Sequence, residues 1–144
     1  MLESWKLIAI FTPVVFVIYQ TLSKLLPKNT SVFLVTAYAS LVGSLVMFAI
    51  HLITSSDKSL QLPSKSLGLA ILIGLFIVTG NFLIVKAYTL GAPQSTFTAL
   101  FYPVLIILGV LFGMVVWHER LNFIQALGIV LSILGVVLIS YFRK

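Results

Sequence analysis

The sequence contains no cysteine and very few charged residues. Without cysteine, the chain has no disulfide, no thiolate metal site and no cysteine nucleophile. Charged residues make up only 8% of the 144 residues, whereas hydrophobic residues make up 60%. A typical soluble domain carries about 25% charged residues, and a chain this short has too little interior to bury so much apolar surface in water. The composition therefore predicts an integral membrane protein.

Acidic residues are also scarce, and the three in the sequence, Glu3, Asp57 and Glu119, lie near the ends of different hydrophobic segments. Such separated carboxylates form no acid–base pair, and the sequence contains no HExxH metal motif, Gly-rich phosphate loop or nucleophile elbow. We therefore expect no enzyme activity, no bound metal and no cofactor. The net charge is +6, but the Lys and Arg residues are scattered rather than clustered, which argues against a nucleic-acid partner.

Five hydrophobic segments are long enough to cross a bilayer, which takes about 20 helical residues. They cover residues 5–26, 31–54, 66–90, 94–117 and 122–141. Turn and polar residues separate them, and Asn122 with Gln125 has the pattern of an N-cap and its partner at the start of a helix. The segments show no period-two alternation, and an open sheet cannot span lipid. We predict an all-α, multi-pass membrane protein with one domain over residues 1–144.

The basic residues divide almost equally between the two sides of a five-span protein. They are Lys6, Lys58, Lys65 and Arg120 on the N-terminal side, and Lys24, Lys28, Lys86, Arg143 and Lys144 on the other. Orientation normally follows a clear Lys/Arg excess on the cytoplasmic side. The difference of one leaves two interpretations open: a single orientation set by other features, or dual topology in which two copies pair antiparallel.

Polar residues inside the first, third and fourth segments are the candidates for binding a solute. They are Tyr19, Gln20, Asn81, Tyr88, Thr98 and Tyr102. Polar groups at membrane depth normally face the interior of a helix bundle or a wet cavity. Two interpretations remain open: these groups make hydrogen bonds between helices, or they line a cavity.

Other residues in these segments suggest moving parts. Pro13 and Pro103 lie beside the polar faces of their segments, and each removes a helical hydrogen bond, so we assign them as hinges. Lys86 lies inside the third segment near its end, where snorkelling explains it, and a gate or coupling role is the alternative. Glu119 is the second gate or coupling candidate; it also suits the positive end of the fifth helix or a pairing with Arg120.

Small residues recur at helical spacing in three segments. The second segment carries Thr36, Ser40 and Ser44, the fourth carries Gly109 and Gly113, and the fifth carries Gly128, Ser132 and Gly135. Such rows let membrane helices approach closely. We therefore predict that all three rows serve helix packing.

An ordered series of short motifs occupies the second half of the chain, at residues 85–92, 101–104, 118–121 and 125–129. They comprise Ala-Tyr-x-x-Gly at the end of the third segment, a proline in the fourth, a glutamate after it, and a Gly-rich fifth segment. In order and spacing this series resembles the EamA domain of the drug/metabolite transporter superfamily. The whole chain corresponds to one five-helix unit of that domain.

Many members of this superfamily resemble two such units fused in inverted orientation, with ten helices. The resemblance implies that this chain is half of a ten-helix inverted-repeat fold, and that a second, inverted copy supplies the other half as an antiparallel homodimer. It implies a small secondary transporter that moves a small organic solute by alternating access, in a bacterial or archaeal inner membrane. In such a dimer, Lys86 of one copy and Glu119 of the other lie on the same side.

Two alternatives to solute transport stay open. Smaller four-helix relatives in the superfamily are associated with translocation of carrier lipids, so the first alternative is a flippase for a lipid-linked head group. The second is a non-transporting subunit of a larger membrane complex. The expected partners are accordingly a small solute or a lipid, together with the lipids of the membrane itself.

Overall fold

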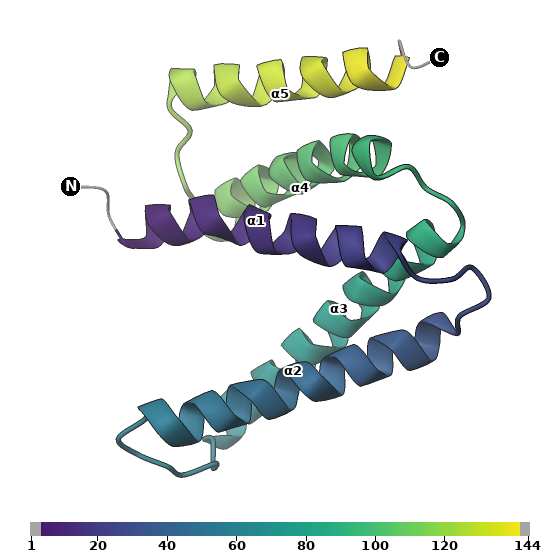
Figure 1. The fold of residues 1–144 in the computed structure, drawn as a ribbon. Coiled ribbons are helices and arrows are strands. Elements are labelled where there is room, and N and C mark those ends of the chain that lie inside the picture. Colours follow the sequence, from purple (N-terminus) through teal and green to yellow (C-terminus); the bar gives the residue numbers. More distant parts are fainter. Residues whose placement is uncertain (1–3, 142–144) are drawn as a thin grey trace. The chain divides into compact units, whose positions relative to one another are not determined.

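The computed structural model describes residues 4–141, and these form five helices (Figure 1). The helices are α1 (Ser4–Lys24), α2 (Val32–Thr54), α3 (Ser64–Thr89), α4 (Gln94–Val116) and α5 (Phe123–Tyr141). No strand occurs between residues 4 and 141, which confirms the all-α prediction. The largest differences from the predicted segments are two residues, at the end of α1 and at the start of α3.

Side chains close the starts of α2 and α5. Ser31 Oγ accepts a hydrogen bond from the N–H of Leu34 at 3.5 Å, at the start of α2. At the start of α5, Asn122 Oδ1 accepts from the N–H of Ile124 at 2.6 Å, and Gln125 Oε1 accepts from the N–H of Asn122 at 2.9 Å. This reciprocal pair confirms the N-cap predicted from the sequence, and it satisfies N–H groups that have no partner within the helix.

The ends of α3 and α4 both use a left-handed residue, but of different kinds. Gly91, two residues after the end of α3, has φ +90°, where glycine carries no steric cost. His118 has φ +54° after α4, and a non-glycine residue is uncommon in this region. The N–H of Glu119 then donates to the carbonyl of Gly113 at 3.1 Å, so the turn satisfies a helix-end carbonyl.

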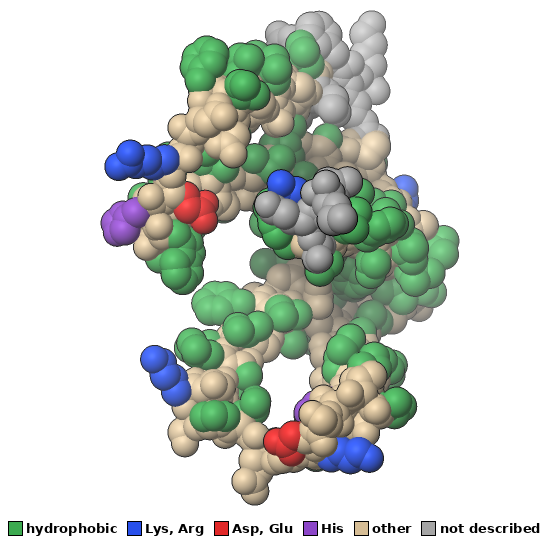
Figure 2. All heavy atoms as spheres, turned by 90° about the vertical axis from the view of Figure 1, so that its left-hand side faces the viewer, with side chains coloured by type: hydrophobic (Ala, Val, Ile, Leu, Met, Phe, Trp, Pro, Cys, Tyr) green, Lys and Arg blue, Asp and Glu red, His purple; other side chains and the backbone are tan. Residues whose placement is uncertain are grey.

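The helices expose most of their apolar side chains. By length and composition, α1 to α4 can each cross a membrane, while the searched part of α5, Phe123–Leu138, is a shorter apolar helix. Large side chains such as Phe76 and Ile53 are 78% and 81% exposed. Figure 2 shows hydrophobic side chains over much of the visible surface, interrupted by few charged ones. Such a surface requires lipid, as expected for a multi-pass membrane protein.

The chain divides into two compact units, residues 1–91 with α1 to α3 and residues 92–144 with α4 and α5. In the first unit, α3 packs against both α1 and α2; in the second, α4 packs against α5. The buried side chains of the first unit gather where α1 ends, α2 begins and α3 ends. They are Val32, Ile84, Val85, Tyr88, Gln20, Ser23 and Thr36. This core closes one end of the first unit.

Candidate functional site

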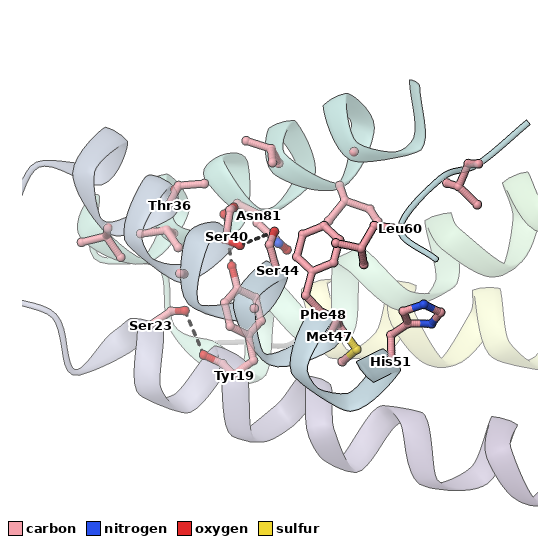
Figure 3. A pocket seen from close by; sticks show the side chains of 18 of the residues that line it. Tyr19, Ser23, Thr36, Ser40, Ser44, Met47, Phe48, His51, Leu60 and Asn81 are labelled. Atoms are coloured by element: carbon pink, nitrogen blue, oxygen red, sulfur yellow. Dashed lines mark hydrogen bonds between the residues drawn. The ribbon is translucent and has the colours of Figure 1, made fainter. Parts of the chain in front are cut away.

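A groove of about 840 Å³ lies in the first unit, along α2 and α3 (Figure 3). Its lining on α2 runs from Val35 to His51, which is roughly 24 Å at 1.5 Å per residue. The hydrocarbon core of a bilayer is about 30 Å thick, so the length of the groove is comparable to that thickness. The lining consists of Tyr19 and Ser23 from α1; Val35, Thr36, Ala39, Ser40, Gly43, Ser44, Met47, Phe48 and His51 from α2; Ser59, Leu60 and Leu62 from the loop after α2; and Gly74, Ile77, Val78, Asn81 and Val85 from α3.

The row of small residues on α2 forms one wall of this groove. Thr36, Ser40 and Ser44 were predicted to pack against another helix; all three line the groove, and Thr36 is also buried in the core of the first unit. Gly43 lies in the same wall, and a Cβ built on it would meet nothing within 4 Å. Small side chains therefore leave space at this wall that the other helices of the first unit, α1 and α3, do not fill.

The hydroxyl groups of this wall are partly used by the helix itself. Thr36 Oγ1 donates to the carbonyl of Val32 at 2.9 Å, and Ser44 Oγ donates to the carbonyl of Ser40 at 2.8 Å. Each oxygen keeps lone pairs that can accept a further hydrogen bond. The Ser40 hydroxyl and the Asn81 side-chain amide make no hydrogen bond within residues 4–141, and both side chains are half-buried.

Four of the predicted polar residues come together between α1 and α3. Tyr19 Oη donates to the backbone carbonyl of Asn81 at 3.2 Å, and both residues line the groove. Tyr88 Oη donates to Gln20 Oε1 at 3.1 Å, and the Gln20 side chain is completely buried. The structure thus contains both arrangements that the sequence left open: a bond between helices for Gln20 and Tyr88, and a groove lining for Tyr19 and Asn81. Contact with a solute remains a prediction for all four.

The remaining polar candidates, Thr98 and Tyr102, lie on α4 in the second unit and are half-buried. The ring of Tyr102 meets that of Phe101 edge-on, with centroids 5.4 Å apart, and the Tyr102 hydroxyl has no hydrogen-bond partner among the described residues. The two predicted hinges, Pro13 in α1 and Pro103 in α4, both lie inside helices. Their role as hinges remains a prediction.

The two charged candidates lie in different units. Lys86 is exposed near the end of α3, where its carbonyl accepts a hydrogen bond from the N–H of Leu90 at 3.0 Å. Glu119 is exposed in the loop between α4 and α5. Its carboxylate lies against Gly113, where an added Cβ would come within 2.7 Å of Glu119 Oε2. Their roles in gating or coupling stay predictions.

His51 is a groove residue that the sequence gave no reason to select. Its Nδ1 and the Ser55 hydroxyl form a hydrogen bond of 2.8 Å, and its Nε2 bonds the carbonyl of Ser59 at 3.1 Å. These bonds tie the loop after α2 back onto that helix, at the end of the groove opposite Tyr19 and Asn81. A single histidine at the end of a hydrophobic segment carries no such signal, because the contact depends on how the loop folds.

Charge is absent from the lining of the groove. None of the groove residues, all within the described part of the first unit, is Lys, Arg, Asp or Glu. Between residues 4 and 141, no group of three or more His, Cys, Asp or Glu side chains could hold a metal ion. Hydrogen bonding and apolar contact are therefore the interactions that this lining offers a ligand.

The sequence pattern of a known family covers almost the whole chain. Residues 3–141 match the EamA-like transporter family. No curated protein and no solved structure matches the chain. The family match spans all five helices, including the four that are long and apolar enough to cross a membrane. The chain therefore belongs to the EamA-like transporter family and is an integral, multi-pass membrane protein.

Proposed function

We propose that this protein is a small secondary transporter that moves a small organic solute across the membrane by alternating access. The groove of the first unit is the observation that carries the proposal. Its volume of about 840 Å³ lies within the range of about 300–1,000 Å³ that is usual for small-molecule sites. Family membership supports the same class of activity.

In this proposal, Tyr19 and Asn81 contact the solute, and the buried bond between Gln20 and Tyr88 holds the wall behind them. That bond joins α1 to α3, and the Gln20 side chain is completely buried. The bond therefore resists separation of the two helices. Of the residues outside the groove, Thr98 and Tyr102 remain candidates for solute contact, Pro13 and Pro103 for hinges, and Lys86 and Glu119 for gate or coupling groups.

The transporting form that we propose is an antiparallel homodimer in a bacterial or archaeal inner membrane. Alternating access usually needs two repeats that rock around a site near the membrane midplane. One five-helix chain supplies one repeat, and the nearly equal division of Lys and Arg permits insertion in both orientations. C-terminal reporter fusions test this: signal from both sides of the membrane supports the antiparallel pair, and signal from one side contradicts it.

Solute flux into proteoliposomes tests the transport itself. Purified protein is reconstituted and supplied with a broad panel of metabolites, with and without a pH gradient. We expect flux of at least one solute, and a clear reduction in the Asn81→Ala variant. The matched control is Thr79→Ala on the same helix, because Thr79 is exposed and lies outside this groove. Absence of flux across the panel would contradict the proposal.

A flippase for a lipid-linked head group is the second candidate, and the apolar lining of the groove favours it. Met47, Phe48, Ile77 and Val78 offer a lipid chain a continuous apolar surface. This function predicts a lipid bound to the purified protein and head-group translocation in vesicles. A non-transporting subunit would instead copurify with a larger partner and show no flux.

A further inference from the structure

The lining of the groove says what kind of solute it accepts. Building on the proposed transport function, we infer that the solute is uncharged, elongated and largely apolar, with a hydrogen-bonding group at one end. The inference concerns the groove of the first unit alone, and three features of its lining carry it: the absence of charge, the clustering of polar groups, and the apolar remainder.

Charge is the first feature. The groove contains no Lys, Arg, Asp or Glu, so a charged solute finds no counter-ion there. Apart from Tyr19, the titratable side chain in the lining is His51, and both of its ring nitrogens already make hydrogen bonds, to Ser55 and Ser59. Placing an unpaired charge in an apolar setting is strongly unfavourable. The groove therefore selects against anions and cations alike.

The polar groups are the second feature, and they gather toward one end. Figure 3 shows Tyr19, Ser40, Ser44 and Asn81, from three different helices, close to one another. The hydroxyls of Tyr19 and Ser44 donate their hydrogen bonds to backbone carbonyls, so toward a ligand they act as acceptors. The Asn81 amide and the Ser40 hydroxyl can both donate and accept. This set suits a neutral group that does both, such as a hydroxyl or a primary amide.

The apolar remainder is the third feature. Met47, Phe48 and Leu60 lie beyond the polar cluster, toward His51 (Figure 3). Gly43 and Gly74 also line the groove, and a Cβ built on either would meet nothing within 4 Å. The space left at these glycines admits a chain or a flat ring lying along the helices. The solute therefore places its polar end near Asn81 and extends its apolar body toward the loop after α2.

A series of probes that differ only in their end group tests this inference. The full-length protein is purified, and its thermal midpoint Tm is measured with 6-phenylhexan-1-ol, 6-phenylhexylamine or 6-phenylhexanoate at equal free concentration and pH 7. At this pH the amine is a cation and the carboxylate an anion. A ligand that binds only the folded state raises Tm. We expect a rise with the alcohol and none with the charged members.

Two variants separate binding in the groove from partition into the detergent. Gly43→Phe fills the groove and should abolish the Tm rise with the alcohol. Gly68→Phe makes the same change on α3 outside this groove and should retain the rise, because Gly68 is exposed and its added Cβ meets nothing within 4 Å. An equal rise in both variants would overturn the inference, as would a rise with either charged probe that matched the alcohol, or no rise with any probe.

A designed charge provides a further test. Ser40→Asp places a carboxylate in the polar cluster, and we expect at least tenfold weaker binding of the alcohol together with new binding of the amine. Continued preference for the alcohol would count against the position of the polar end. If this variant does not fold, the wild-type probe series and the glycine variants still decide the question.

The outcomes also separate this inference from the proposed transport function. Binding of the alcohol without flux of any solute would support the inference of a neutral, apolar ligand and contradict the proposed transport function. Flux of a charged solute that is lost in Gly43→Phe would support transport through the groove and contradict the inference that the ligand is neutral.

Discussion

The two compact units differ in which side chains they bury and in whether their tyrosine hydroxyls make hydrogen bonds. The first unit buries Gln20, Ser23 and Thr36 among its helices, whereas the buried residues of α4 in the second unit are Pro103 and Gly113. In the first unit two tyrosine hydroxyls each bond a neighbouring helix. In the second, the Tyr102 hydroxyl has no hydrogen-bond partner within the described residues.

Helix number explains part of this contrast. In a three-helix unit, α3 contacts one neighbour on each of two sides, so polar side chains can bond across one interface while small residues open a groove beside the other. The two-helix unit has a single interface, formed by α4 and α5. The groove accordingly lies in the first unit. Each of the following experiments supports or contradicts this difference between the two units.

Filling the groove should have the largest effect. In Gly43→Phe the ring occupies the space beside Ser40 and Ser44, and we expect solute flux to fall about tenfold or more, which corresponds to about 1.4 kcal/mol of lost binding free energy. Flux into proteoliposomes measures this. The Gly68→Phe variant should keep near-normal flux; equal losses in both would mean that the groove is not the solute path.

Substitutions at the two left-handed residues, Gly91 after α3 and His118 after α4, should change the free energy of unfolding in opposite directions. Gly91→Ala puts a Cβ on a residue with φ +90°, and we expect it to lower the free energy of unfolding by about 1–2 kcal/mol. His118→Gly removes the same kind of strain and should raise it by about 0.5–1 kcal/mol. Denaturant titration in mixed micelles compares the two. A destabilised His118→Gly variant would show that contacts of the imidazole outweigh the backbone term.

Removing one hydroxyl from each unit should distinguish their tyrosines. Tyr88→Phe deletes the buried bond to Gln20, and we expect a loss of about 0.6–1.7 kcal/mol in the free energy of unfolding. Tyr102→Phe removes a buried hydroxyl that has no partner in the described residues, so stability should stay unchanged or rise. The same unfolding titration measures both. Equal losses would contradict the difference between the units.

The helix caps should give the smallest effects. Asn122→Ala removes a cap bond of 2.6 Å at the start of α5, and we expect a loss of about 1 kcal/mol. Ser31→Ala removes a bond of 3.5 Å at the start of α2. We expect the free energy of unfolding to fall by only about 0.5 kcal/mol, because a bond this long is weak. Amide hydrogen exchange at the first turn of each helix measures the local loss of stability. A larger effect at Ser31 would reverse this order.

The positions of the helices were largely predictable from the sequence. Runs of apolar residues end at turn residues such as Gly91, or at the cap formed by Asn122 and Gln125, and these local signals placed the helix ends within about two residues. Family membership followed from the order of motifs in the second half. Both depend on residues close together in the chain, so no knowledge of packing was needed.

The division of labour among the polar residues was decided by tertiary structure. Gln20 and Tyr19 are neighbours in the chain, yet one is buried against Tyr88 and the other lines the groove. Likewise, Thr36, Ser40 and Ser44 have the spacing of a packing row, yet Thr36 is buried while all three also line the groove of the first unit. Spacing determines which side chains share a face of a helix. Only the placement of the neighbouring helix determines whether that face is packed against protein or left open to a ligand, because this depends on contacts between residues far apart in the chain.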